Sequence, residues 1–262
     1  MKLKKEILQT DLLIIGGGAA GCIAAIGAKE QSNLDVLVLE KAEISRSGDA
    51  GGGNDHLLAH LNTGEAWDTD QAMTEYYTRL SQGLIDKGVA TRLHISRIRE
   101  IVDKLESFGI EMRDSKTGQY LRTKSFGQPG PYYINFKGKN MKPVLANEVK
   151  KRGAKVLNRI NVTNLLTHGK RIVGAMGFNV RNGNSCVVKS KTTLLATKAA
   201  LERKESRMGS AHIRGDYPAT DDEHFHGSII LRKGRGGAVQ VTFEPAKNNN
   251  TSREFIYATN NR

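Results

Sequence analysis

Three glycines near the N-terminus, Gly16, Gly18 and Gly21, have the G-x-G-x-x-G spacing of a turn that binds a pyrophosphate. An apolar stretch before them predicts a β-strand, and a helix is expected from Ala19 to about Gln31. A second apolar stretch, Leu34–Glu40 ("LDVLVLE"), ends in an acid about twenty residues further on. This order of strand, turn, helix and strand is typical of the dinucleotide-binding fingerprint, whereas the glycine spacing alone is weak evidence.

Each residue type in this motif has a chemical role. Gly16 permits the tight turn, Gly18 lets the pyrophosphate approach the backbone, and Gly21 allows the helix to pack closely on the strand. The helix N-terminus offers free N–H groups and a partial positive charge to the phosphates. Glu40 can accept hydrogen bonds from ribose hydroxyls, and its charge disfavours a 2′-phosphate. The alternative is a glycine-rich turn of an α/β protein that binds no nucleotide.

Length and charge restrict the class of protein. The chain has 262 residues, enough for one large domain or two small ones, and its 28 glycines against 5 prolines favour an α/β protein. The formal net charge of +13 favours anionic partners such as nucleic acid, a membrane surface or an acidic ligand. Because Lys and Arg are dispersed without a dense run, the pattern argues against nucleic-acid binding.

Cysteines and histidines give little support for metal or disulfide chemistry. The two cysteines, Cys22 and Cys186, form neither a disulfide framework nor a metal-site spacing, which suits a reducing cytoplasm. His224 and His226 stand beside three acids, but no third ligand motif is evident, so no metal site is predicted. The cysteine usage leads us to expect a cytoplasmic protein. No stretch is long and apolar enough to span a membrane.

The rest of the chain is predicted to alternate between helices and strands. A Gly- and Ser-rich loop of about two dozen residues follows Glu40, and it is too long to be a mere connector, so it is expected to be functional. A change to period two after Lys155 predicts four short strands with turns at His168-Gly169 and Asn182-Gly183. Other expected elements are a helix capped by Asp68, a helix at about Val89–Phe108, a hairpin turning at Lys116–Gly118, a packed aromatic segment at Tyr132–Phe136, a helix from Pro143 to Gly153 and a strand in "AVQVTFEP".

Several segments together resemble one family of flavoproteins. They are "IIGGGAAG", "LEKAEISRSG", "MKPVLANEVKKRG", "VGAMGF" and "ALERKESRMGSAHIRGDYPATDD". The chain resembles the flavoprotein subunits of succinate dehydrogenase, fumarate reductase and adenylylsulfate reductase over most of residues 9–247, and its long loop is most similar to the alpha subunit of adenylylsulfate reductase. The resemblance implies that FAD is the cofactor, that the substrate is a small molecule and that the partner is an iron–sulfur electron-transfer subunit.

The resemblance also implies a domain layout and a cofactor site. We expect a Rossmann-like FAD-binding domain, a parallel sheet with a three-stranded β-meander, at residues 1–198, and a C-terminal helical segment with a disordered tail at 199–262. Ser47 and Gly48 match the loop that approaches the flavin. No His follows Arg46-Ser47, so FAD should be held non-covalently. The expected cofactor-binding residues are Gly16, Gly18, Ala19, Ala20, Gly21, Glu40, Lys41, Ser47, Gly48, Val162, Ala196 and Thr197.

One junction departs from the family pattern. The stretch "LLAT" runs directly into "KAALERKESR" at Thr197-Lys198, whereas the family has a capping domain and substrate-binding Arg and His residues between these two parts. The chain therefore resembles an internally shortened flavoprotein. No catalytic residue is predicted, since His212 and Arg214 match the helical region away from the substrate.

Three functions remain open at this point. The first is an FAD-dependent oxidoreductase subunit that exchanges electrons with an iron–sulfur partner, because two cysteines are too few for its own cluster. The second is a non-catalytic flavin- or nucleotide-binding remnant. The third is a basic nucleic-acid-binding protein that reuses the fold.

Overall fold

The computed structural model describes residues 3–53, 55–81, 83, 85, 88, 90–124, 127–136, 141–169, 171–194, 227–233 and 239–245. Contacts divide the chain into two compact units. The first comprises Met1–Ala59, Ile98–Ala196 and Lys233–Val239, and the second comprises His60–Arg97, Thr197–Arg232 and Gln240–Arg262. The predicted domain boundary at residue 198 and the segment Asp221–His226 lie outside the described residues.

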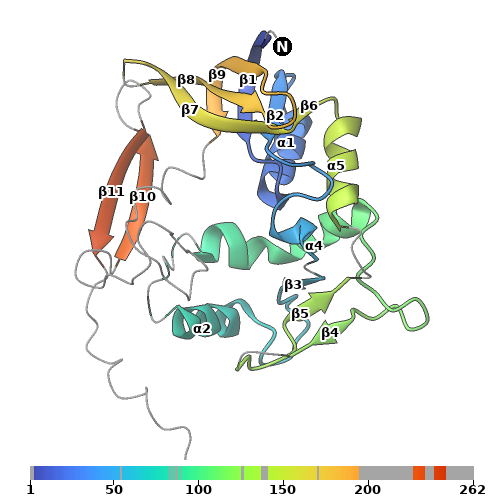
Figure 1. Cartoon of the computed structure of the whole chain (residues 1–262). Helices are drawn as coiled ribbons and strands as arrows, with labels where there is room; N and C mark the ends of the chain where they lie inside the picture. The colour runs from blue at the N-terminus through green and yellow to red at the C-terminus, as the bar shows by residue number, and fades with distance from the viewer. Residues whose placement is uncertain are drawn as a thin grey trace, which may run out of the picture. The chain divides into compact units, whose positions relative to one another are not determined.

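The first unit is built on a six-stranded sheet with the order β6-β2-β1-β9-β8-β7 (Figure 1). Strands β1, β2, β6 and β9 are parallel, while β7, β8 and β9 form an antiparallel meander. The predicted α/β class, with a parallel sheet and a three-stranded meander, is confirmed. The strands are β1 (Lys5–Ile15), β2 (Val36–Glu40), β6 (Lys155–Asn158), β7 (Ile160–His168), β8 (Arg171–Asn179) and β9 (Ser185–Leu194).

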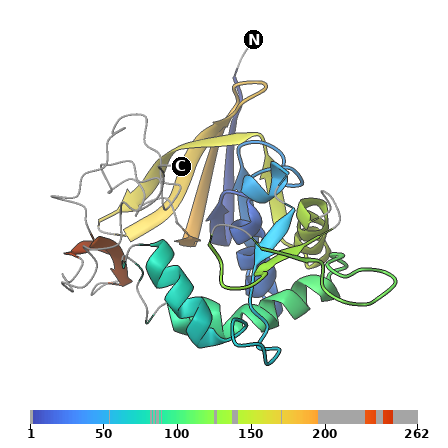
Figure 2. The same cartoon turned by 90° about the horizontal axis from the view of Figure 1, so that it is seen from below.

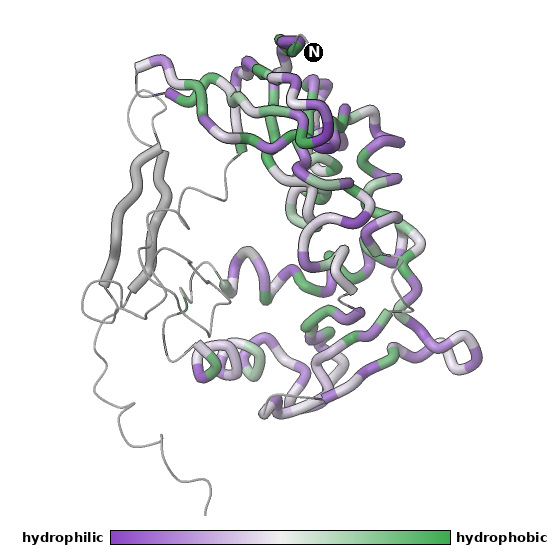
Figure 3. Tube along the Cα trace, in the orientation of Figure 1, coloured by the Kyte–Doolittle hydropathy of each residue, from purple (hydrophilic) through white to green (hydrophobic). Residues whose placement is uncertain are grey.

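Strand β2 is buried on both of its faces. All five residues of β2 are buried, as expected for a parallel strand covered on both sides. One hydrophobic cluster joins β1 and β2 to the meander. Hydrophobic colour is accordingly frequent along these strands (Figure 3). The members of this cluster are Leu13, Leu37, Leu39, Ile160, Ala175, Cys186 and Val188.

Two helices of the first unit, α1 (Ala19–Gln31) and α5 (Met141–Lys151), lie side by side (Figure 2). Helix α1 contacts β1 and β2, and the side chain of Ile14 points towards it. The buried face of α5 consists of Lys142, Leu145, Ala146 and Val149, which follow helical spacing. Small residues dominate α1, and this lets its backbone come close to the strand and to the turn that precedes it.

Gly21 is the position where that approach is closest. A Cβ atom there would lie 2.0 Å from the carbonyl oxygen of Gly16. Gly21→Ala should therefore lower the free energy of unfolding by about 1–3 kcal/mol or more, because backbone cannot move aside as a flexible side chain can. Urea unfolding followed by circular dichroism measures the change. Gly27→Ala is the matched control, because a Cβ at Gly27 meets nothing within 4 Å, and its stability should be unchanged or slightly raised. Equal stability of the two variants would contradict the prediction.

A second, three-stranded sheet has the order β3-β5-β4, with β3 at His56–Leu58, β5 at Tyr133–Asn135 and β4 at Arg122–Thr123. The expected hairpin turning at Lys116–Gly118 is present, because an antiparallel bridge joins Arg113 and Tyr120. The expected packing of the aromatic segment is confirmed too. Its buried members are Tyr132, Ile134 and Phe136.

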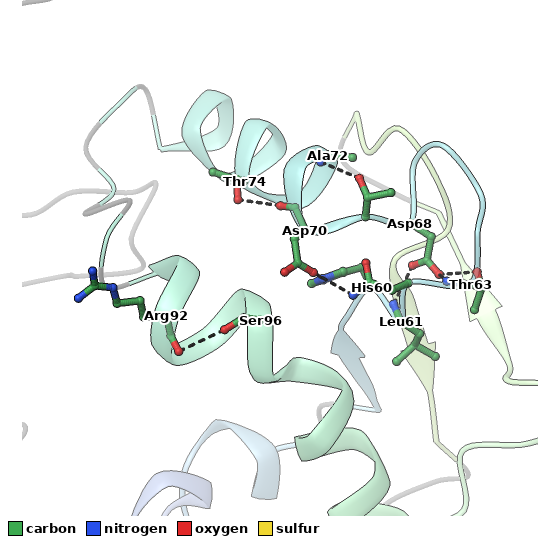
Figure 4. A network of polar contacts seen from close by, with 11 residues as sticks. His60, Leu61, Thr63, Asp68, Asp70, Ala72, Thr74, Arg92 and Ser96 are labelled. Carbon is green, nitrogen blue, oxygen red and sulfur yellow. Dashed lines mark hydrogen bonds and ion pairs between the residues drawn. The ribbon is translucent and has the colours of Figure 1, made fainter.

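Two helix predictions need correction. The helix expected at Val89–Phe108 is regular only in α4 (Ile98–Ser107), since a π-helical turn (η2, Ala90–His94) and a 3-10 turn (η3, Ile95–Arg97) precede it. Helix α2 (Asp70–Leu80) is capped by Thr69, whose side chain accepts a hydrogen bond from the Ala72 N–H. Asp68 was expected to be the cap. Its carboxylate instead accepts hydrogen bonds from the backbone N–H groups of Leu61 and Thr63, because the loop turns back beside it (Figure 4).

The remaining described elements are short. The loop after β2 contains a 3-10 turn, η1 (Asp49–Gly51), and near the C-terminus β10 (Gly227–Lys233) pairs with β11 (Val239–Pro245). The strand expected in "AVQVTFEP" is therefore confirmed, while β10 was not predicted. Within the described residues, no helix meets the length and apolarity that a membrane crossing requires.

Candidate cofactor site

The glycine-rich turn connects β1 to α1. Gly16 has a φ of 97°, a left-handed conformation that favours glycine, and its N–H donates to the Leu39 carbonyl at the end of β2. Gly18 is the N-cap of α1, and no side chain caps this helix. No acid lies in its first turn either. The N–H groups of the first turn therefore have no partner from the helix itself, and they form a site suited to an anion.

The loop with Ser47 and Gly48 meets this turn directly. Gly48 has a φ of 74°, and a Cβ atom on it would lie 2.9 Å from the Gly18 Cα. The Ser47 hydroxyl donates to the Gly17 carbonyl at 3.1 Å and is almost fully buried. The structure thus brings together two predicted segments that are thirty residues apart in the sequence. Gly18 itself has space beside it, because its own Cβ would meet no atom nearer than the Gly48 Cα at 3.8 Å.

Glu40 stands at the carboxyl end of β2 and faces the turn. One carboxylate oxygen accepts the Gly17 N–H at 2.6 Å, and the other accepts the Ala42 N–H at 2.6 Å. The side chain is 6% exposed. Each oxygen keeps a lone pair, so the carboxylate can still accept hydrogen bonds from ribose hydroxyls. The sequence predicts that Glu40 contacts the ribose. The hydrogen bond from the Gly17 N–H shows that Glu40 also fixes the turn, which was not predicted.

Two further residues of this site were not predicted. Lys142 on α5 is 1% exposed, and its ammonium lies 2.5 Å from the Gly17 carbonyl oxygen and 3.2 Å from Cys22 Sγ. Lys142 lies on the buried, apolar face of α5, and the helical spacing of that face can be read from the sequence. Asn158 ends β6, and its side chain accepts from the Ile44 N–H and donates to the Glu43 carboxylate, which anchors the loop after β2.

The other predicted cofactor residues lie in the first turn of α1, after β2, on β7 or outside the described residues. Ala19 and Ala20 form the first turn of α1, and Lys41 is exposed directly after β2. Val162 lies near the start of β7, which contacts β2, and it packs against the hydrophobic cluster of the sheet. Ala196 and Thr197 lie outside the described residues.

The two cysteines are buried thiols without a disulfide. Burial raises the pKa of Cys22, while the positive charge of Lys142 acts in the opposite direction. Burial also raises the pKa of Cys186. Both side chains are therefore neutral at physiological pH, and neither has the exposed thiolate that a reactive cysteine needs.

A separate polar network lies in the second unit (Figure 4). His60 is 1% exposed, and its Nε2 lies 2.7 Å from Asp70 Oδ1, which also accepts from the Asn62 amide. The hydrogen bonds from Asn62 and then from His60 lower the pKa of Asp70. Tyr77 and His94 form a second pair at 3.1 Å. The contacts of His60 and Asn62 with Asp70 hold the loop before α2 in place. In the described part of the chain, no cluster of three or more metal-ligating side chains occurs.

A family model described as an FAD binding domain matches residues 11–219, well over half of the chain. The chain belongs to this family of FAD-binding flavoproteins. A second model, described as the C-terminal part of the fumarate reductase flavoprotein, matches residues 190–258. The residues around the turn fit FAD, because they leave an uncapped helix N-terminus for the pyrophosphate, an open Gly18 and an acid at the end of β2.

Known relatives come from the same family. The flavoprotein is 26% identical to one subunit of the CoM/CoB fumarate reductase of Methanothermobacter marburgensis over 229 residues, which are 84% of this chain and 38% of that one. It is 28% identical to the fumarate reductase flavoprotein subunit of Helicobacter pylori over 217 residues, 73% of this chain and 30% of the relative. The flavoprotein thus spans only 30% to 38% of the length of these relatives.

Solved structures agree with this assignment. Adenylylsulfate reductase from Archaeoglobus fulgidus superimposes with a TM-score of 0.65 at 28% identity, over 75% of this chain and 31% of that one. The Sdh1 complex of Mycobacterium smegmatis gives a TM-score of 0.64 at 21% identity, over 73% of this chain and 34% of that one, and supports the fold. The flavoprotein therefore has relatives among the fumarate reductases and adenylylsulfate reductases, and it shares its fold with the Sdh1 complex.

Proposed function

We propose that the flavoprotein is an oxidoreductase subunit of the adenylylsulfate or fumarate reductase type that holds FAD non-covalently. The observation that supports this most is the uncapped N-terminus of α1, framed by Gly48 on one side and Glu40 on the other. Bound FAD would supply the electron-transfer chemistry. In this proposal the turn binds the pyrophosphate and Glu40 orients the ribose. Gly48 occupies the position where covalent attachment of the flavin would need a histidine.

An iron–sulfur subunit is the proposed electron-transfer partner. The chain has only two cysteines, Cys22 and Cys186, and both are buried and lie in different parts of the sheet unit. A cluster needs four ligands, and we propose that these ligands reside on a partner chain. The free cysteines also support a reducing compartment, and we propose the cytoplasm.

A second candidate function is a non-catalytic FAD-binding protein. The match to the C-terminal family model begins at residue 190, within the range matched by the FAD-binding model, while the chain spans only 30% to 38% of the relatives' length. This supports the proposal that the capping and substrate-binding middle is missing. A basic nucleic-acid-binding protein remains the third candidate, and it has no support beyond net charge.

A flavin spectrum of the purified protein tests the proposal and separates the third candidate from the others. We expect a yellow protein that releases free flavin on heat or acid precipitation. A protein that stays colourless after incubation with FAD contradicts flavin binding, and flavin that stays on the denatured chain contradicts non-covalent attachment.

Glu40 offers a quantitative test of the ribose assignment. Glu40→Ala should weaken FAD binding by ~1–3 kcal/mol, the scale of losing hydrogen bonds to a charged group. The loss arises from the ribose contacts and from the Gly17 N–H, which loses its acceptor. Fluorescence titration with FAD measures the affinity, with exposed Asp35→Ala as the control variant. An affinity equal to that of the control would show that Glu40 does not contribute to the site.

A further inference from the structure

The Gly17 residue is held at both of its backbone groups by side chains of opposite charge. Its N–H donates to the Glu40 carboxylate at 2.6 Å, and its carbonyl accepts the Lys142 ammonium at 2.5 Å. The Ser47 hydroxyl donates to the same carbonyl. Both peptide planes that flank Gly17 are therefore fixed, one by the acid of β2 and the other by the lysine of α5.

The direction of the second plane matters for an anion. In a trans peptide the C=O and the following N–H point in opposite directions. Because Lys142 holds the Gly17 carbonyl on its own side, the Gly18 N–H points away from Lys142. No acceptor for this N–H occurs within the described part of the chain. A rotated Gly17 peptide would present its carbonyl oxygen in place of this N–H and would repel a phosphate.

Lys142 is also a buried charge that makes no direct ion pair with a described residue. Its side chain is 1% exposed, and among the described residues its ammonium contacts no carboxylate. Its two contacts, Gly17 O and Cys22 Sγ, are neutral groups, and burial raises the pKa of that thiol. A buried ammonium without an anionic partner destabilises a fold by itself. The positive end of the α1 dipole lies beside Lys142, and the Glu40 carboxylate on the N–H side of Gly17 balances part of this positive charge. A pyrophosphate at the helix N-terminus would complete the balance.

We propose that Lys142 is a positioning residue of the cofactor site, which aims the Gly18 N–H at the FAD pyrophosphate and supplies part of the charge that balances it. The proposal rests on the proposed FAD-binding function. According to this proposal, Lys142 contributes to FAD binding and lowers the stability of the cofactor-free protein. The reason is that its unpaired ammonium destabilises the protein until the cofactor is bound. A lysine that only supported the fold would have the opposite effect on stability.

Two variants, Lys142→Met and Lys142→Gln, test the proposal on the full chain. Methionine keeps the length of the side chain without charge, and glutamine keeps a hydrogen-bond donor without charge. Both should weaken FAD binding about tenfold or more, the scale of a charge-assisted contact to an anion. The melting temperature of the cofactor-free protein should stay the same or rise in Lys142→Met. Exposed Lys150→Met on the same helix is the matched control and should bind as the unchanged protein does.

The outcomes are distinguishable. Binding of FAD by both Lys142 variants within about twofold of the unchanged protein overturns the proposal, and so does a cofactor-free melting temperature that falls together with the affinity. Failure of both variants to fold would assign Lys142 to the fold and would overturn it as well. If the unchanged protein binds no FAD, the proposed function itself is wrong.

Discussion

Replacing Gly18 with valine is expected to abolish FAD binding and to leave the chain folded. Gly18 has a φ of −61°, which any residue can adopt, and a Cβ there meets nothing closer than the Gly48 Cα at 3.8 Å. The protein therefore has room for a Cβ atom at this position. The pyrophosphate does not, because it must approach the Gly18 backbone and the uncapped first turn of α1. Equilibrium dialysis with FAD measures binding, and circular dichroism confirms folding.

A valine at Gly27 is the matched control for this experiment. Gly27 lies further along α1, and a Cβ there meets nothing within 4 Å. Gly27→Val should bind FAD as the unchanged protein does. If Gly18→Val also binds FAD with undiminished affinity, the pyrophosphate lies elsewhere and the turn is a structural element only.

The sequence was sufficient to predict the sheet and the turn, because local signals determine both. Continuous apolar residues in β2 correspond to burial on both faces of that strand. Alternating apolar and polar residues in β7 to β9 correspond to burial on one face. The glycines at 16, 18 and 21 have the spacing that the turn requires, and the close approach of Gly21 to the Gly16 carbonyl explains the third of them. Glu40 was located because the fingerprint has a fixed separation between glycines and acid.

Lys142 and Asn158 could not be assigned in the same way. Lys142 reaches Gly17 across 125 positions of the chain, and Asn158 reaches Ile44 across 114, so only the tertiary fold brings them together. A lysine on the apolar face of α5 was visible in the sequence, but its partner was not. The incorrect prediction of the N-cap of α2 has a similar cause over a short sequence distance. Asp68 and Thr69 are both good N-cap residues, and the return of the loop from Leu61 to Thr63 decided between them.

The flavoprotein alone is expected to show little or no reductase turnover. The stretch "LLAT" runs directly into "KAALERKESR", and the match to the C-terminal family model begins at residue 190. The family resemblance places the second flavin contact and the substrate-binding Arg and His residues in the middle part, which we propose to be missing at this junction. Each lost hydrogen-bond donor in a preorganised site typically costs ~10²–10³ in rate. Several such losses, together with an uncovered flavin ring, should leave no specific turnover.

Anaerobic reduction of fumarate and of adenylylsulfate with reduced viologen as donor measures this turnover. Exposed reduced flavin reacts with oxygen, so peroxide formation in air should exceed substrate reduction. The Gly18→Val variant is the control, because it should lose the peroxide signal together with the flavin. Turnover of about 1 s⁻¹ or more with either substrate would contradict the prediction, since this is an ordinary enzyme rate. Residues retained in the chain would then form a substrate site that the family resemblance does not contain, and His56, His212 and Arg214 would be the first to replace.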